Sequence, residues 1–137
     1  MKNKLIWLVL FLTSSFIFGG CESKIEESLA PVEVIDIFIA ESFPVQVYVK
    51  INGYLPTPCY KISRIEQYRE ENIFYIAIMI QDNDEICIQV IEPYQQTVSL
   101  EVYGLPAGTY QVKVNGVMGS FTLDVDNILL PDIFTTE

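Results

Sequence analysis

The sequence predicts an all-β fold, a single antiparallel β-sandwich of about seven strands. Alternating apolar segments flank Asn115-Gly116, a dipeptide typical of type I′ hairpins because that turn needs two positive φ angles. Further strand-like segments recur between turn signals, without helical periodicity or an internal repeat. At 137 residues the chain suits one domain with its own core. A closed barrel is the alternative architecture.

The N-terminus has the pattern of an export signal. Two lysines precede an apolar run over residues 5–18, which is too short to span a bilayer comfortably. The following Gly19-Gly20-Cys21 resembles the lipobox of bacterial lipoproteins, although Phe18 stands where that motif usually has leucine. The resemblance implies cleavage before Cys21 and lipid attachment to it. An ordinary secretory signal and an uncleaved anchor are the alternatives.

The chain divides into four parts by composition. We expect a lipoprotein signal peptide at 1–20, a polar tether at 21–31, the sandwich at 32–126 and an apolar C-terminal tail at 127–137. A flexible tether of this length reaches about 15–20 Å on average, which would hold the domain close to its membrane.

Seven segments of the body are strand candidates. Residues 32–40 are apolar on both faces, which predicts a strand that is central or covered on both sides. The alternation shifts phase within 59–69, which predicts a bulge near Ser63-Arg64. Residues 86–91, which are not counted among the seven, are either a short strand or an irregular crossing segment. The other candidates are 44–52, 73–80, 97–103, 109–114 and 117–125.

One turn carries a resemblance to a known fold. Leu105-Pro106-Ala107-Gly108-Thr109-Tyr110 resembles the turn before the sixth strand of immunoglobulin-like and fibronectin-III-like domains. The resemblance implies an immunoglobulin-like sandwich in which Tyr110 is the corner tyrosine, with its hydroxyl bonded to backbone a few residues upstream. The stretch from Glu41 through Phe121 also resembles small exported bacterial lipoproteins without an assigned activity.

Two cysteines remain after Cys21. In an exported protein, Cys59 and Cys87 most simply form a disulfide, and two buried free thiols are the alternative. Such a bridge would stabilise the fold by roughly 3–4 kcal/mol in the chain-entropy model. It is not the antibody type, because the only tryptophan, Trp7, lies in the leader and valines occupy the strands that antibody domains bridge.

Composition argues against most catalytic chemistry. The chain has no histidine, which removes the commonest general base and zinc ligand, and it has no Cys-x-x-Cys. We therefore expect no enzyme, no metal and no cofactor. Removal of the leader would take away two lysines and no acidic residue, lowering the formal net charge from −10 to −12. Such acidity disfavours nucleic acid as a partner.

Two loops are candidate sites. Asp82, Asp84 and Glu85 could supply oxygens to calcium, or carboxylates to a glycoside hydrolase, but a solvated acidic turn is the simpler interpretation. Tyr54 and Leu55, with Tyr94 near by, form a candidate ligand loop, because exposed aromatics on sandwich loops hold peptides or sugars. Alternatively, this segment closes the end of the core.

The leading hypothesis is a non-catalytic binding module, exported to the bacterial cell envelope and lipid-anchored through Cys21. It would contact an envelope protein or glycan through loops or a sheet edge. A secreted proteinase inhibitor that presents Tyr54 and Leu55 to a protease is the alternative. A carboxylate-based hydrolase is a third hypothesis.

The leader and the cysteine pair are tested together by intact mass spectrometry of the membrane-extracted protein. We expect a mass that begins at Cys21 with added acyl chains, and a gain of about two daltons on reduction of one disulfide. An unacylated mass without that gain would contradict export and lipidation.

Overall fold

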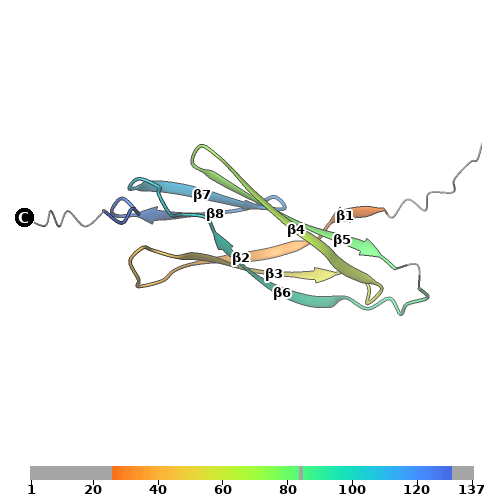
Figure 1. Ribbon diagram of the computed structural model, residues 1–137. Coiled ribbons are helices and arrows are strands. Elements are labelled where there is room, and N and C mark those ends of the chain that lie inside the picture. The colour runs from red at the N-terminus through yellow and green to blue at the C-terminus, as the bar shows by residue number, and fades with distance from the viewer. Residues whose placement is uncertain (1–25, 84, 131–137) are drawn as a thin grey trace, which may run out of the picture.

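The computed structural model describes residues 26–83 and 85–130, which form two packed β-sheets (Figure 1). One sheet has the order β2-β3-β6, and the other contains β1, β4, β5, β7 and β8. The expected all-β sandwich is confirmed. No helix among the described residues is long and apolar enough to cross a membrane. The strands are β1 (Glu27–Leu29), β2 (Val32–Ile39), β3 (Val47–Leu55), β4 (Tyr60–Glu70), β5 (Ile73–Asp82), β6 (Glu92–Leu100), β7 (Gly108–Val114) and β8 (Val117–Leu123).

The core lies between the inner faces of the two sheets. Alternate residues of β3 and β5 are buried, as the period of two in an extended strand requires. Three aromatic rings, those of Phe74, Tyr110 and Phe121, pack together with centroids 5.5–6.1 Å apart. Burial of these apolar side chains holds the two layers together.

β5 is the central strand of the larger sheet. β4 pairs with its whole length, so β1 and β7 share the other edge, β1 beside residues 79–81 and β7 beside residues 73–76. The β5–β7 pair is parallel, whereas the other strand pairs are antiparallel. In immunoglobulin domains the sixth strand, which carries the corner tyrosine, lies beside the third strand of the fold. Here the strand that carries Tyr110 is β7, and its neighbours are β5 and β8, whereas β4 lies at the edge of the sheet.

Three local predictions are confirmed. The Tyr110 hydroxyl donates a hydrogen bond of 2.7 Å to the Pro106 carbonyl, which is the expected tyrosine corner. Asn115 and Gly116 have φ angles of 43° and 96°, as a type I′ hairpin requires. The register between β4 and β5 shifts between Ile62 and Arg64, where the bulge was expected.

The prediction for residues 32–40 is wrong. β2 is an edge strand rather than a central one, and Val34 and Phe38 are about half exposed. Its inner face does contribute to the core, because Ile35 and Ile37 pack against it and over Gly119 of β8. The apolar residues on the outer face of β2, Val34 and Phe38, are therefore exposed and not covered by another layer of the described residues.

The boundaries of the folded body are wider than expected. β1 lies inside the expected tether, and the neighbouring Ala30 is buried. Asn127, the first residue of the expected tail, is fully buried and bonds to the backbone of Val45 and Val102. Residues 86–91 form no strand, and β6 starts at Glu92, earlier than the expected 97. Residues 131–137 lie outside the described residues.

A side chain closes a gap in the β5 hydrogen-bond ladder. β7 pairs with β5 as far as Ile76, and β1 begins to pair at Met79, so Ile78 faces the hairpin turn. There the Asn115 side-chain oxygen accepts from the Ile78 N–H at 3.1 Å. Its amide nitrogen donates to the carbonyls of Ala30 and Ile78 at 2.8 and 3.0 Å. Asn115 therefore joins β1, β5 and the hairpin.

The contribution of this side chain is tested by Asn115→Gly, which keeps the freedom to adopt a positive φ but removes all three hydrogen bonds. We expect a loss of about 2–3 kcal/mol in the free energy of unfolding, because buried backbone groups lose their partners. Urea unfolding measures it. A loss below about 0.5 kcal/mol, the size of an ordinary surface substitution, would show that the side chain is dispensable.

Candidate functional site

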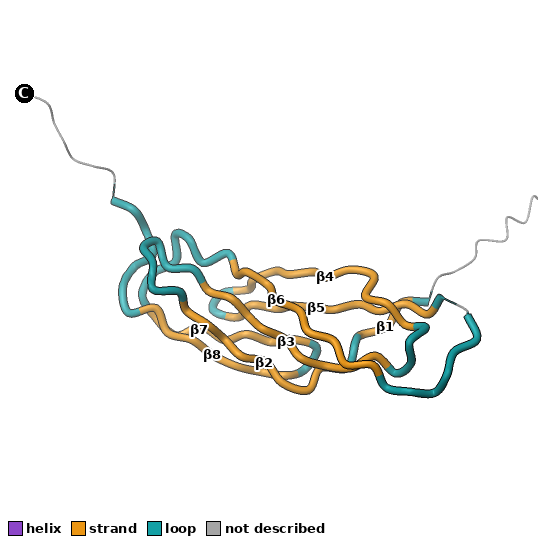
Figure 2. Tube along the Cα trace, turned by 90° about the horizontal axis from the view of Figure 1, so that it is seen from below, coloured by secondary structure: helices purple, strands orange, loops and turns teal. Residues whose placement is uncertain are grey.

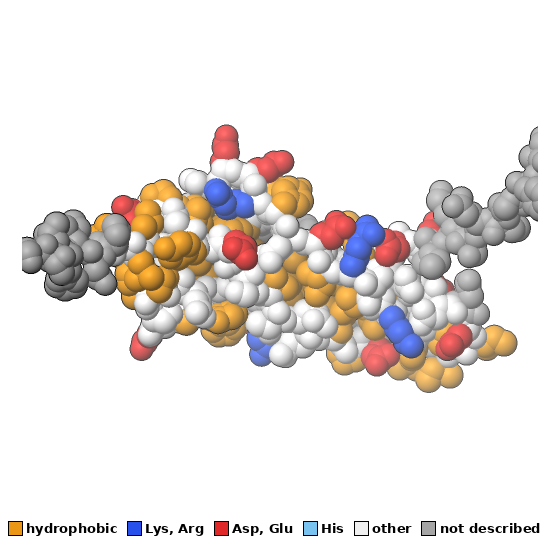
Figure 3. All heavy atoms as spheres, in the orientation of Figure 1, with side chains coloured by type: hydrophobic (Ala, Val, Ile, Leu, Met, Phe, Trp, Pro, Cys, Tyr) orange, Lys and Arg blue, Asp and Glu red, His pale blue; other side chains and the backbone are white. Residues whose placement is uncertain are grey.

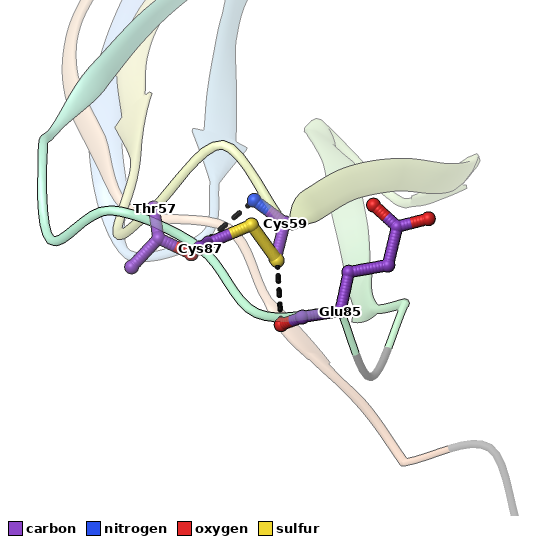
Figure 4. Close-up of a disulfide and its surroundings, with 4 residues drawn as sticks. All are labelled: Thr57, Cys59, Glu85 and Cys87. Carbon is purple, nitrogen blue, oxygen red and sulfur yellow. Dashed lines mark hydrogen bonds between the residues drawn. A yellow bond between two sulfur atoms is a disulfide. The ribbon is translucent and has the colours of Figure 1, made fainter.

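A disulfide fixes the end of the sandwich at which the chain enters β1. Cys59, just before β4, is bonded to Cys87 in the connection between β5 and β6, with the two Cα atoms 5.8 Å apart (Figure 4). The Cys59 N–H donates to the Thr57 hydroxyl at 3.3 Å, and the Cys59 sulfur contacts the Glu85 carbonyl oxygen at 3.0 Å. The expected pairing is confirmed.

The acidic residues near this disulfide do not form a recognisable metal centre within the described part of the chain. Asp82 is the last residue of β5 and pairs in register with Tyr60. Asp82 and Glu85 line the same shallow hollow of about 270 Å³. Asp84 lies outside the described residues, and no three His, Cys, Asp or Glu side chains gather elsewhere in 26–83 and 85–130. Calcium binding by this turn, the alternative to a solvated acidic turn, stays a hypothesis.

Tyr94, an expected ligand residue, has a structural contact. Its hydroxyl donates to the Pro31 carbonyl at 3.0 Å, and the same carbonyl accepts from the Tyr54 N–H at 3.3 Å. Gly53 permits this approach, because a Cβ there would lie 2.7 Å from the Tyr94 hydroxyl and still closer to the Pro31 oxygen. Burial raises the pKa of Tyr94 to about 12.

The candidate ligand loop is therefore corrected. Tyr54 and Leu55 belong to β3 rather than to a loop, and Leu55 is buried in the core. Their segment closes the end of the core, which was the alternative interpretation. This placement also removes the loop that the proteinase-inhibitor hypothesis would present to a protease.

The strand edges supply a different candidate surface, which sequence reasoning did not locate. Two edges carry features that discourage the pairing of a further strand. β4 has a bulge and five charged residues, and β2 has a bulge and two. A third edge, that of the uncharged β8, has β2 of the other sheet lying against it.

The edge of β6 has no bulge, and its one charged residue, Glu92, and its one proline, Pro93, both lie at its beginning. Among residues 26–83 and 85–130, β3 is the only strand that pairs with β6, so within this part of the chain the other edge of β6 is unpaired. From Pro93 to Leu100 it carries no charge, and Pro93 at its beginning is the only residue without an N–H. Figure 1 shows β6 along one border of the molecule. This unpaired edge is called the β6 edge below.

The sheet opposite β6 extends beyond it. Directly opposed residues share a face of a sheet, so Ile65 and Gln67, which pair with the buried Ile78 and Ile76, face inward. Yet Ile65 is 38 % exposed and Gln67 is also exposed, because no strand of the smaller sheet covers β4. The smaller sheet therefore has room for one more strand, beside β6 and beneath β4.

An exposed apolar surface lies at the end of the sandwich opposite the disulfide. Phe43, Val125 and Leu130 are more than half exposed there and help to line an open groove of about 530 Å³. Hydrophobic side chains are visible at both ends of the molecule in Figure 3. Ile128, Leu129 and Leu130 of the expected tail are exposed here.

Comparison with known proteins identifies the domain. The family model described as the ORF11 beta-sandwich domain matches residues 49–123, from the third residue of β3 to the end of β8. No solved structure matches the chain.

Two similar proteins come from Herpetosiphon aurantiacus. The "Uncharacterized 10.2 kDa protein in HgiCIIM 5'region" is 32 % identical over 93 residues, which cover 67 % of this chain and 98 % of the relative. The "Uncharacterized 10.2 kDa protein in HgiBIM 5'region" is 34 % identical over 83 residues, covering 60 % of this chain and all of the relative. Neither name states an activity.

The Tyr94 contact predicts how stability depends on pH. The pKa is raised from 10.0 to about 12, so folding favours the neutral hydroxyl. Its contribution is complete below pH 10 and is lost as the pH rises toward 12. Between pH 8 and pH 11, the free energy of unfolding in urea should fall more in the parent than in Tyr94→Phe. At pH 8 the variant should be about 1 kcal/mol less stable than the parent. Equal losses would contradict this assignment.

Proposed function

The chain belongs to the ORF11 beta-sandwich domain family, and from that premise we propose that it is a non-catalytic binding module, lipid-anchored at the bacterial cell envelope. Its partner is an extended segment of another protein, which pairs with the β6 edge as an additional strand. The leader and Cys21 support the location. The absence of histidine from the sequence supports a role other than catalysis.

One observation carries the proposal, namely that residues 94–100 of β6 form an uncharged, proline-free edge with room for one more strand beside it. Sheet edges bind peptides by adding a strand, in which backbone hydrogen bonds give affinity and alternate side chains give specificity. The inner side chains of an added strand would continue the face of Gln96 and Val98 and lie beneath Ile65 of β4. That position favours apolar inner residues in the partner.

Charge adds a second requirement for the partner. The chain has a formal net charge of −10, so the outward residues of the added strand should be neutral or basic. Residues 93–100 of β6 carry no charge themselves, so they do not select a particular charge pattern in the partner strand.

Pairing between two copies of the chain fits less well. A two-fold symmetric dimer through β6 would pair the strands antiparallel and place the two disulfide ends at opposite ends of the assembly. Both chains enter β1 at the disulfide end, so their lipid anchors could not enter one membrane side by side. This geometry favours a different protein as the partner.

A matched pair of charge substitutions tests the β6 edge. Gln96 is on the inner face opposite the buried Ile51, whereas the adjacent Gln95 is exposed on the outer face. Peptides selected from a random library on the native protein should bind Gln96→Lys about tenfold or more weakly, because the added strand would bury an ammonium group. The Gln95→Lys control places the same charge in solvent and should change the affinity by less than about threefold.

Unfolding midpoints of both variants would establish that they fold. Peptides that bind the parent and Gln96→Lys equally well would contradict the β6 edge as the interface, as would a selection that yields no binder. Self-association of the parent that Gln96→Lys abolishes would identify a second copy as the occupant instead.

A further inference from the structure

The connection between β5 and β6 exposes four aliphatic side chains within six residues. Ile86 is fully exposed and Ile88 is 70 % exposed, while Val90 and Ile91 are 52 % and 62 % exposed. These four residues are called the apolar loop below. Cys87 lies between the first two and is bonded to Cys59, so the disulfide ties the loop to the body. Clusters of exposed apolar side chains mark surfaces that contact a partner or a membrane.

The apolar loop lies at the end of the sandwich where the chain enters. Glu27, the first residue of β1, pairs with Gln81 near the end of β5, and the connection to β6 begins two residues later. Figures 1 and 2 both show the start of β1 and this connection at the same end of the molecule. The groove near Leu130 is at the other end, beside the C-terminal segment.

Cys21 stands six residues before Glu27 in the sequence. Six extended residues span at most about 20 Å, so acyl chains on Cys21 would keep this end of the domain close to the lipid surface. The apolar loop is an exposed apolar surface at that end, whereas the residues that line the groove near Leu130 belong to the other end.

We propose that the apolar loop is a second membrane contact, which inserts its aliphatic side chains at the boundary between lipid headgroups and acyl chains. This inference rests on the proposed lipid anchor at Cys21. The contact is hydrophobic rather than electrostatic, because Glu85 and Glu92 flank the loop and it contains no lysine or arginine. This contact holds the sandwich by one end, so that its long axis points away from the membrane surface. The β6 edge stays accessible along the side of the domain.

Tryptophan fluorescence tests the insertion, because the leader contains the only tryptophan of the sequence. Ile88→Trp in the mature lipidated protein is then the sole tryptophan, and it can be excited at wavelengths where tyrosine does not absorb. In vesicles of phosphatidylcholine with brominated acyl chains, it should lose about half or more of its emission relative to unbrominated vesicles. Leu129→Trp is the matched control, since it replaces an exposed aliphatic residue at the opposite end, and its emission should not change.

Intact mass spectrometry of the same samples separates the two claims. An acylated mass with quenching at position 88 alone supports both the anchor and the loop contact. An acylated mass with equal emission in both vesicle types, or with equal quenching at 88 and 129, overturns the loop contact and leaves the anchor standing. An unacylated mass overturns the anchor, and the loop inference fails with it.

Discussion

The structure depends on the backbone of β5 being hydrogen-bonded along both edges. β4 covers one edge completely, but no single strand covers the other, because β7 and β1 each reach only part of it. The Asn115 side chain fills the interval at Ile78 and also bonds to Ala30. A buried strand with unpaired groups would be costly, so this side chain allows two short neighbours to serve one long strand. It also holds β1 in place and thereby determines where the chain enters the domain.

The sequence predicted features that depend on local chemistry. Asn115-Gly116, the bulge near Ser63-Arg64 and the Tyr110 corner each follow from the φ requirement, alternation or motif of a few residues. It did not predict features that depend on distant segments. The side-chain hydrogen bonds between Asn115 and Ile78 and between Asn127 and Val45 each join residues more than thirty positions apart. The parallel β5–β7 pair joins strands that are not consecutive in the chain.

The candidate site was misplaced for a related reason. The sequence predicted a loop at residues 53–55 because a glycine begins this segment and prolines follow it. Gly53 is instead part of β3, where the lack of a side chain lets Pro31 and Tyr94 approach its backbone. The uncharged run over 93–100 was visible in the sequence, but only the sheet order shows that its edge is unpaired. Together, the anchor, the apolar loop and the β6 edge describe a domain held by one end at a membrane, with a strand-binding edge along its side.

Hydrogen exchange of the β6 backbone tests this strand-binding edge most directly. Amides of β6 that point away from β3 have no partner strand among residues 26–83 and 85–130, so part of residues 92–100 should exchange rapidly. A peptide selected on the native protein should slow exchange in residues 92–100 while leaving residues 117–123 of β8 unchanged, as measured by mass spectrometry. Protection confined to β8, or to the end loops without any change in β6, would contradict the account.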